Sequence, residues 1–290
     1  MNVEVLVAAG ALVGEGPCWD PASQRLLWVD LGANRVHSSD LSTGGTDTRT
    51  FAETVGAVVP IDGGGMLLAN TQGFARIQRL DAKLELVVEV ESDLPNNRMN
   101  DGKCDPFGRM WAGSMSLTLA RNAGSLYRLD SDMTTHRVLG RTTVSNGLAF
   151  TPDARKCYFI DSVLRRVDVL ALDEAGSLLS RDVFIDLSPY PGSADGMTID
   201  SEGCLWIAFY RAGQVRRFSC AGRMEKCIEF PATITTSVAF GGPHLDILCV
   251  TTGNAALSEN ERIEQPYAGS IFGVDVGVTG RPEVAFRCRA

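Results

Sequence analysis

Short runs of apolar residues, separated by turns rich in Asp, Ser, Gly and Pro, recur along the whole chain. In the stretch 194–208, a polar residue precedes a glycine, an apolar strand leads into a turn at 200–203, and a second apolar strand follows. The same order occurs at 144–161, around the turn Thr151-Pro152-Asp153-Ala154. Four more copies lie at 14–30, 55–69, 100–113 and 237–250. The copies recur roughly every 40 to 50 residues, a period typical of the blades of a β-propeller.

Each copy also carries a third run that alternates between apolar and polar residues, and most carry a weaker fourth. Residues 124–130 and 269–274 are third runs, and residues 85–90 and 182–186 are fourth runs. Such alternation indicates β-strands. No segment keeps a helical period over three turns, so helices are expected only as short insertions. We therefore predict an all-β fold, a six-bladed β-propeller with four-stranded blades, in which residues 1–290 form a single domain.

Two terminal segments are candidates for completing the last blade. Residues 3–7 and residues 283–286 both have the pattern of an outer strand. Either could pair with the edge of the sixth sheet and close the ring, and the pattern does not choose between them.

Composition and net charge limit which partners and which compartment are expected. The formal net charge of −8 at pH 7 argues against nucleic acid or an anionic membrane surface as a partner. No apolar run approaches the roughly 20 residues needed to span a bilayer. The eight cysteines are not clustered, which favours unpaired thiols in a reducing compartment. We therefore expect a cytoplasmic protein, either a monomer or a weak homo-oligomer.

Polar residues gather at one position of the repeat. In a propeller the first strand of each blade lines the central channel, so residues at the start of these strands form a ring around its mouth. Carboxylates directed at one small cavity repel each other and lose hydration, and a bound cation is the simplest compensation. The residues that the repeat places at this position are Glu15, Val55, Asp101, Asn146, Asp195 and Ser237.

Glu15, Asn146 and Asp195 are therefore predicted to hold one divalent metal ion. Asp and Asn before glycine are also common turn residues, but their recurrence at one position of the repeat favours a shared site. Two carboxylates and an amide, without His or Cys, suit a hard cation. Calcium, magnesium, manganese, zinc and ferrous iron all stay open. Asp101 is either a further ligand or an acceptor that braces the ligands.

Four motifs resemble those of the senescence-marker-protein/gluconolactonase family, and they follow in order along the chain: Gly14-Glu15-Gly16-Pro17, Arg98-Met99-Asn100-Asp101-Gly102, Ser145-Asn146-Gly147-Leu148 and Asp195-Gly196-Met197. The resemblance covers essentially the whole chain. It implies a six-bladed propeller that holds one divalent metal and hydrolyses sugar lactones. Glu15, Asn146 and Asp195 match the family's metal ligands. Arg98 and Asn100 match residues that contact the sugar, and Asp195 matches the acid proposed as general base.

Two departures from the family's pattern leave the substrate open. Residues 115–122 lack the carboxylate that some members use to hold the sugar, which makes Arg121 or the hydroxyl groups of this segment candidate replacements. Arg211 stands where relatives frequently carry a small or amide residue, and it would favour a polar or acidic substituent if it faced the site. Two other functions also stay open: a non-enzymatic calcium-binding propeller module, and a phosphotriesterase or aryl-esterase on the same scaffold.

Overall fold

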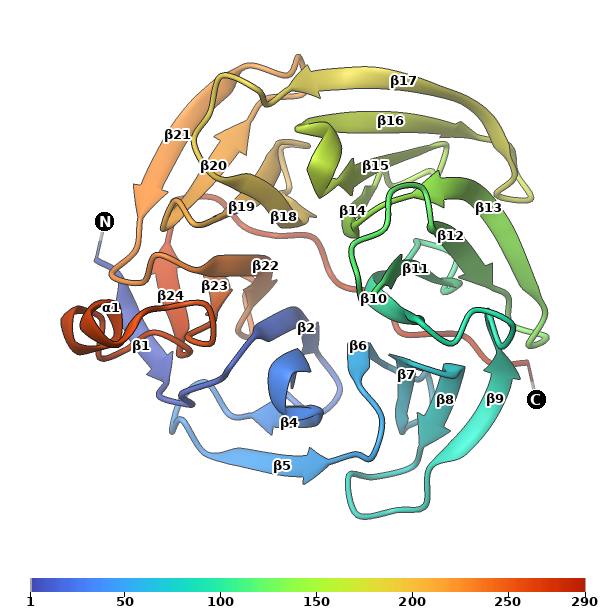
Figure 1. The fold of residues 1–290 in the computed structure, drawn as a ribbon, viewed down its shortest axis with the longest axis horizontal. Helices are drawn as coiled ribbons and strands as arrows, with labels where there is room; N and C mark the ends of the chain where they lie inside the picture. Colours follow the sequence, from blue (N-terminus) through green and yellow to red (C-terminus); the bar gives the residue numbers. More distant parts are fainter. Residues whose placement is uncertain (1, 290) are drawn as a thin grey trace.

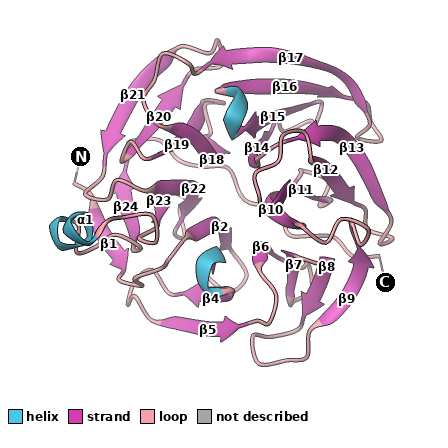
Figure 2. Cartoon of the chain, in the orientation of Figure 1, coloured by secondary structure: helices cyan, strands magenta, loops and turns pink. Residues whose placement is uncertain are grey.

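Six four-stranded antiparallel sheets form a ring around a central channel (Figure 1). The computed structural model describes residues 2–289. Figure 2 shows that strands make up nearly all of the regular secondary structure, with only short helices between them. The prediction of a six-bladed β-propeller with four-stranded blades is confirmed.

The first five blades follow one another along the chain, and within each of them every strand pairs with the next. Blade one consists of β2 (Gly14–Asp20), β3 (Arg25–Asp30), β4 (Arg35–Ser39) and β5 (Thr46–Thr50). Blade two consists of β6 (Val55–Pro60), β7 (Met66–Asn70), β8 (Gly73–Ile77) and β9 (Glu85–Glu89). Blade three consists of β10 (Asn97–Cys104), β11 (Met110–Ser116), β12 (Gly124–Leu129) and β13 (Thr135–Thr142). Blade four consists of β14 (Ser145–Phe150), β15 (Lys156–Asp161), β16 (Arg166–Leu172) and β17 (Leu178–Asp186). Blade five consists of β18 (Ser193–Ile199), β19 (Leu205–Tyr210), β20 (Gln214–Phe218) and β21 (Met224–Glu229).

The sixth blade joins the two ends of the chain. It contains β22 (Thr235–Gly241), β23 (Ile247–Thr252) and β24 (Ile271–Asp275), and its outer strand is β1 (Glu4–Val7). β1 runs antiparallel to β24, with Val5 opposite Phe272. Of the two candidate closing segments, the N-terminal one therefore completes the blade. This pairing covers an edge that would otherwise be open.

The other candidate, residues 283–286, crosses the face of the ring away from the viewer in Figure 1. Phe286 is fully buried there and forms a parallel bridge with Ile61 at the end of β6. Gly280 forms an antiparallel bridge with Asp200, just after β18. The C-terminal segment, residues 276–289, thus lies across the ends of inner strands from several blades.

The burial of each strand follows its position in the blade. The inner strands β6 and β14 are buried at every residue because blades press on both of their faces, whereas the outer strand β5 is mostly exposed. Apolar side chains of adjacent blades form shared clusters, such as Trp206 of β19 with Phe240 of β22. All eight cysteines lie within the described residues and are unpaired, as the sequence predicted.

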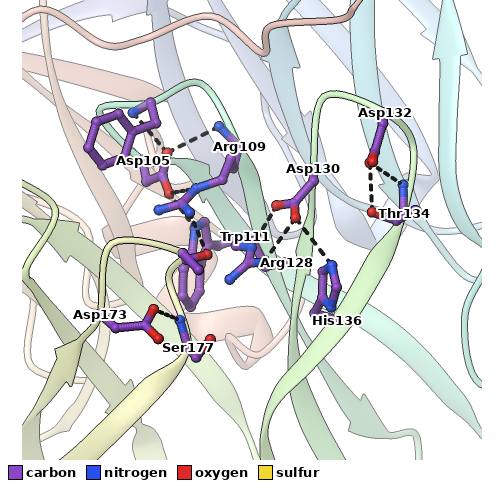
Figure 3. Close-up of polar contacts among 12 residues, drawn as sticks. Asp105, Arg109, Trp111, Arg128, Asp130, Asp132, Thr134, His136, Asp173 and Ser177 are labelled. Atoms are coloured by element: carbon purple, nitrogen blue, oxygen red, sulfur yellow. Dashed lines mark hydrogen bonds and ion pairs between the residues drawn. The ribbon is translucent and has the colours of Figure 1, made fainter.

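Buried turn aspartates fix the hairpins at the end of the channel opposite the mouth. Asp105 accepts hydrogen bonds from the backbone N–H groups of Phe107 (2.9 Å) and Arg109 (3.1 Å) and from Trp111 Nε1 (2.9 Å), as Figure 3 shows. Arg109 Nε also donates to Asp105, at 2.6 Å. The aspartates of these turns therefore serve the fold, in contrast to the acidic residues at the mouth.

Helices are short, as expected. The helix α1 (Glu259–Glu264) has a capping box, in which Ser258 accepts from the N–H of Glu261 and the Glu261 side chain accepts from the N–H of Ser258. Two 3-10 turns, η1 (Leu31–Ala33) and η2 (Ser162–Leu164), follow the second strands of blades one and four. Within the described part of the chain, no helix has the length and apolar character that crossing a membrane requires.

Candidate metal centre

The inner strands bring four polar side chains to the mouth of the channel. Glu15 comes from β2, Asn100 from β10, Asn146 from β14 and Asp195 from β18. Each is 7–9% exposed. Their convergence follows from equivalent positions on the first strands of four blades, since these strands surround one axis.

The structure corrects two positions of the predicted ring. Asn100 lies five residues before the turn residue Asp105, just as Glu15 precedes Asp20 and Asp195 precedes Asp200. Asn100, not Asp101, is thus the equivalent residue of the third blade, and by the same count Thr236, not Ser237, belongs to the sixth. Every inner strand has a register shift near this point, and such a bulge changes which side chains face the channel.

Glycines beside the site residues allow the inner strands to approach closely. A Cβ atom on Gly147 would lie 2.6 Å from the carbonyl oxygen of Asp195, and one on Gly56 would lie 2.4 Å from that of Asn100. Both distances are shorter than a van der Waals contact, so a larger residue would push neighbouring strands apart. The repeated polar-glycine pairs of the sequence therefore reflect close packing around the channel as well as chemistry.

A chain of hydrogen bonds fixes the two amides. Arg98 Nη1 donates to Asn100 Oδ1 (2.7 Å), and Asn100 Nδ2 donates to Asn146 Oδ1 (2.6 Å) and to the carbonyl of Ser145 (2.7 Å). Asn146 Nδ2 donates to Ser162 Oγ at 2.8 Å, and that hydroxyl donates to the carbonyl of Ala194 at 2.7 Å. These contacts orient Asn146 so that Oδ1 keeps one lone pair for a ligand.

The two carboxylates at the mouth are electrostatically destabilised. Burial, and then repulsion from Asp195 and Asp101, raise the pKa of Glu15 well above its usual range. Burial and repulsion from Asp101 also raise the pKa of Asp195, against a hydrogen bond from Asn146 that lowers it. Raised pKa values of this kind mark a site that lacks positive charge.

Asp101 follows Asn100 on β10 and is half-buried. Its Oδ1 accepts from the N–H of Gly102 at 2.8 Å. Burial raises its pKa to about 6, against the lowering effects of Lys103 and of this hydrogen bond. Its charge acts on both Glu15 and Asp195. Both roles considered for Asp101, a further ligand and an acceptor that braces the ligands, stay predictions.

The guanidinium group of Arg98 lies at the same mouth of the channel and carries a positive charge. Its pKa falls to about 10, mainly through burial, although the neighbouring charge of Glu15 acts to raise it. Within the described structure its hydrogen bonds all come from Nη1, which donates to the carbonyl of Met99 (3.0 Å) and to Asn100. Nη2 and Nε are therefore free to donate to a ligand.

The residues present fit a hard divalent cation. Glu15 and Asp195 supply carboxylate oxygens, and Asn146 supplies an amide oxygen that is already oriented. Sequence reasoning missed Ser162, which holds Asn146, and Tyr210, whose pKa is raised by burial and also by the charges of Asp195 and Glu15. No local motif marks either residue, because blade packing alone brings them to the site.

The two arginines considered for the substrate lie differently. Arg211 is directed toward the segment that contains α1: its Nη1 lies 3.4 Å from Glu261 Oε1, and Nη2 donates to the carbonyl of Ala256. Arg121 is exposed in the loop between β11 and β12. Arg211 is therefore engaged with a neighbouring loop, and it also acts on Tyr210, where its charge and a side-chain hydrogen bond partly lower a pKa that burial raises.

A second acidic cluster, formed by Asp200, Glu202 and Cys204, has ligand atoms within 4.8 Å of one another. Arg217 already pairs with its carboxylates, since the guanidinium lies 2.7 Å from Asp200, 2.5 Å from Glu202 and 2.6 Å from Glu225. Asp200 Oδ2 also accepts from Trp206 Nε1. The cluster is an ion-pair network that stabilises a hairpin.

Fold and geometry together define a class of protein: a six-bladed propeller with an oxygen-donor centre at the mouth of its channel. The chain belongs to the SMP-30/gluconolactonase family, because residues 13–254 match the family described as "SMP-30/Gluconolactonase/LRE-like region". The resemblance seen in the motifs is thus confirmed.

Named relatives extend over the full length of the chain. Regucalcin of Xenopus laevis is 34% identical over 99% of this chain and 98% of its own length. Pentonolactonase XacC of Haloferax volcanii is 35% identical over 98% of this chain and 97% of its own length. The crystal structure of a calcium-binding protein, regucalcin from Agrobacterium tumefaciens, matches with a TM-score of 0.93 and 31% identity, over 98% of this chain and 96% of that chain.

Proposed function

We propose that this protein is a sugar lactonase that uses one divalent metal ion, held by Glu15, Asn146 and Asp195, to hydrolyse an aldonolactone to its sugar acid. One observation carries the proposal: two buried carboxylates with raised pKa values and an oriented amide oxygen converge at the channel mouth. Membership of the family and the pentonolactonase among the relatives support a lactone as the substrate class.

The reaction follows from the residues around this centre. A bound divalent cation supplies a Lewis acid that polarises a carbonyl and stabilises the developing oxyanion. Asp195 accepts the proton of the attacking water as general base. Arg98 orients the lactone through the N–H groups that its contacts with the protein leave free. Asn100 donates both amide hydrogens to protein acceptors. Its contact with the sugar would therefore be made by Oδ1.

The first test is hydrolysis of a panel of aldonolactones, measured as acid release by metal-stripped protein with single divalent cations added back. We expect turnover only with a cation, and a loss of at least about a thousandfold in Asp195→Asn, because this change removes a ligand and the base together. Asp62→Asn is the matched control. It makes the same chemical change at an exposed turn after β6 and is expected to keep wild-type turnover.

The outcomes separate the alternative functions. Metal binding without turnover on any ester would favour a calcium-binding module, and turnover of a phosphotriester or aryl ester in preference to lactones would favour the other hydrolase class. Near-normal lactone turnover by Asp195→Asn would reject Asp195 as base and ligand. The same panel identifies which cation and which sugar support the fastest reaction.

A further inference from the structure

A buried ion pair lies in the channel on the side of Asp101 away from the mouth. Lys103 of β10 and Glu283 of the C-terminal segment are in contact, with 3.0 Å between Nζ and Oε1 and side chains that are only 17% and 11% exposed. Burial acts to lower the pKa of Lys103, but Glu283 more than offsets this and the pKa is raised. The Lys103 side chain is therefore an ammonium ion, two residues after Asp101 on β10 and close enough to lower the pKa of Asp101.

The C-terminal segment holds Glu283 in place on both sides. Phe286 N–H donates to the carbonyl of Pro60 (2.8 Å), and Asp62 N–H donates to the carbonyl of Phe286 (2.9 Å). Before Glu283, Ser201 N–H donates to the carbonyl of Thr279 at 2.9 Å. The segment is thus anchored to blades two and five, and Glu283 is carried between these anchors.

Charge along the channel is nearly balanced. Two cationic side chains lie along the channel, Arg98 at the mouth and Lys103 below. The carboxylates are Glu15, Asp101, Asp195 and Glu283. With all six groups ionised, the excess is two negative charges, and Arg281, which borders the same cavity as Lys103 and Glu283, adds one positive charge at the lower end. Glu283 thus contributes to the charge around the site although it is remote in sequence.

We propose that Glu283 is a positioning residue of the metal centre, which holds Lys103 at the lower end of the channel and offsets its positive charge. The C-terminal segment then sets how tightly the cation binds at Glu15, Asn146 and Asp195. The inference rests on the proposed function in one respect, namely that a divalent cation binds at this centre.

The expected size of the effect follows from the surroundings of the pair. Lys103 and Glu283 border a cavity of about 360 Å³ whose other walls include Cys104, Phe150 and Thr198. None of Glu15, Asn146 and Asp195 lines this cavity, so the pair acts on the centre from the opposite side of Asp101. Lys103 and Glu283 both act on Asp101, and Asp101 acts on Glu15 and Asp195. Removing one unit charge from this series of groups is expected to change cation affinity roughly tenfold.

The test compares the calcium dissociation constants of metal-stripped wild type, Glu283→Gln, Lys103→Met and the double variant by titration calorimetry. Glu283→Gln leaves the ammonium uncompensated and should weaken binding roughly tenfold, whereas Lys103→Met leaves an extra carboxylate and should tighten binding to a similar extent. The double variant has no charge at either position and should bind within about twofold of wild type.

Opposite shifts in the two single variants separate an electrostatic role from a structural one. If both variants weaken binding alike, or if neither changes it, the proposal is overturned. Glu174→Gln is the control, because it removes one partner of an exposed pair with Arg155 and should leave the affinity unchanged. If Glu283→Gln does not fold, Lys103→Met and the double variant still decide the sign.

The wild-type titration reports separately on the proposed function. Failure of wild type to bind calcium or any other divalent cation would refute the metal centre, and the role of Glu283 with it. Binding by wild type with unchanged constants in the variants would reject only the role of Glu283.

Discussion

At the scale of single residues, the channel mouth combines groups that are individually unfavourable. Glu15 and Asp195 are buried and repel each other, and Asp101 adds further negative charge. Other residues at these positions would make the fold more stable, because an uncompensated buried carboxylate lowers the free energy of unfolding. Their presence side by side is therefore the strongest physical argument that the site binds a cation.

Asp101 makes the stability of the metal-free protein depend on pH. Its folded-state pKa of about 6 exceeds its usual value of 3.8, so the unfolded chain releases this proton first as the pH rises. The contribution of this group to the free energy of unfolding should consequently fall between about pH 4 and pH 6, by at most about 3 kcal/mol, and stay constant above that range. Glu15 and Asp195, whose pKa values are also raised, add their own losses as the pH rises. Asp101→Asn should remove the part of the slope that Asp101 contributes.

Denaturant unfolding from pH 4 to pH 8 in the presence of a chelator measures this dependence. Asp62→Asn, an exposed aspartate changed in the same way, should keep the wild-type slope. An identical slope in Asp101→Asn would show that Asp101 titrates normally and is not destabilised by its surroundings.

The candidate site was only partly predictable from residue patterns. The recurring polar-glycine pairs located Glu15, Asn146 and Asp195 because these residues occupy one position of a repeat. The third blade was misread by one residue, because the glycine after Asp101 was aligned with the glycines of the other blades, whereas the spacing to the turn aspartate identifies Asn100. Ser162 and Glu283 could not be found, because their roles depend on contacts between segments that are distant along the chain.

At the scale of elements, alternation and turn residues predicted the strands and their grouping into blades. They did not identify the closing strand, because residues 3–7 and 283–286 share one pattern and differ only in long-range pairing. The structure resolves this through packing: Val7 of β1 is 3% exposed and belongs to a cluster with Trp19, Trp28 and Ile271. β1 therefore stabilises the contact between the sixth and first blades.

This closure predicts a large difference between two neighbouring substitutions in β1. Val7→Asp places an unpaired charge in a buried cluster and should lower the free energy of unfolding by about 3–5 kcal/mol. Val5→Asp makes the same change at a position that is 36% exposed and should cost less than about 1 kcal/mol. Urea unfolding of both variants measures the difference, and similar losses would argue against β1 as the strand that seals the ring.

At the scale of the whole molecule, the propeller places an excess of negative charge where its six inner strands surround one axis. The molecule has a net charge of −8, but distant surface charges are largely screened at physiological salt. The excess in the channel is buried and is screened far less. Cation binding should therefore act on the stability of the entire ring, because the inner strands of four blades supply the centre.

We expect calcium at one hundred times its dissociation constant to raise the free energy of unfolding of wild type by about 2.7 kcal/mol. Asp195→Asn should lose this gain, because the cation loses a carboxylate ligand. In chelator the order should reverse, with Asp195→Asn more stable than wild type, since the substitution removes one of two carboxylates that repel each other without a cation between them. Thermal and urea unfolding with calcium or chelator, at matched ionic strength, measure both effects. Equal stabilisation of the two proteins by calcium would place the cation elsewhere, whereas a crossing of the two stabilities would mean that this protein gives up stability of its metal-free fold in order to bind the ion.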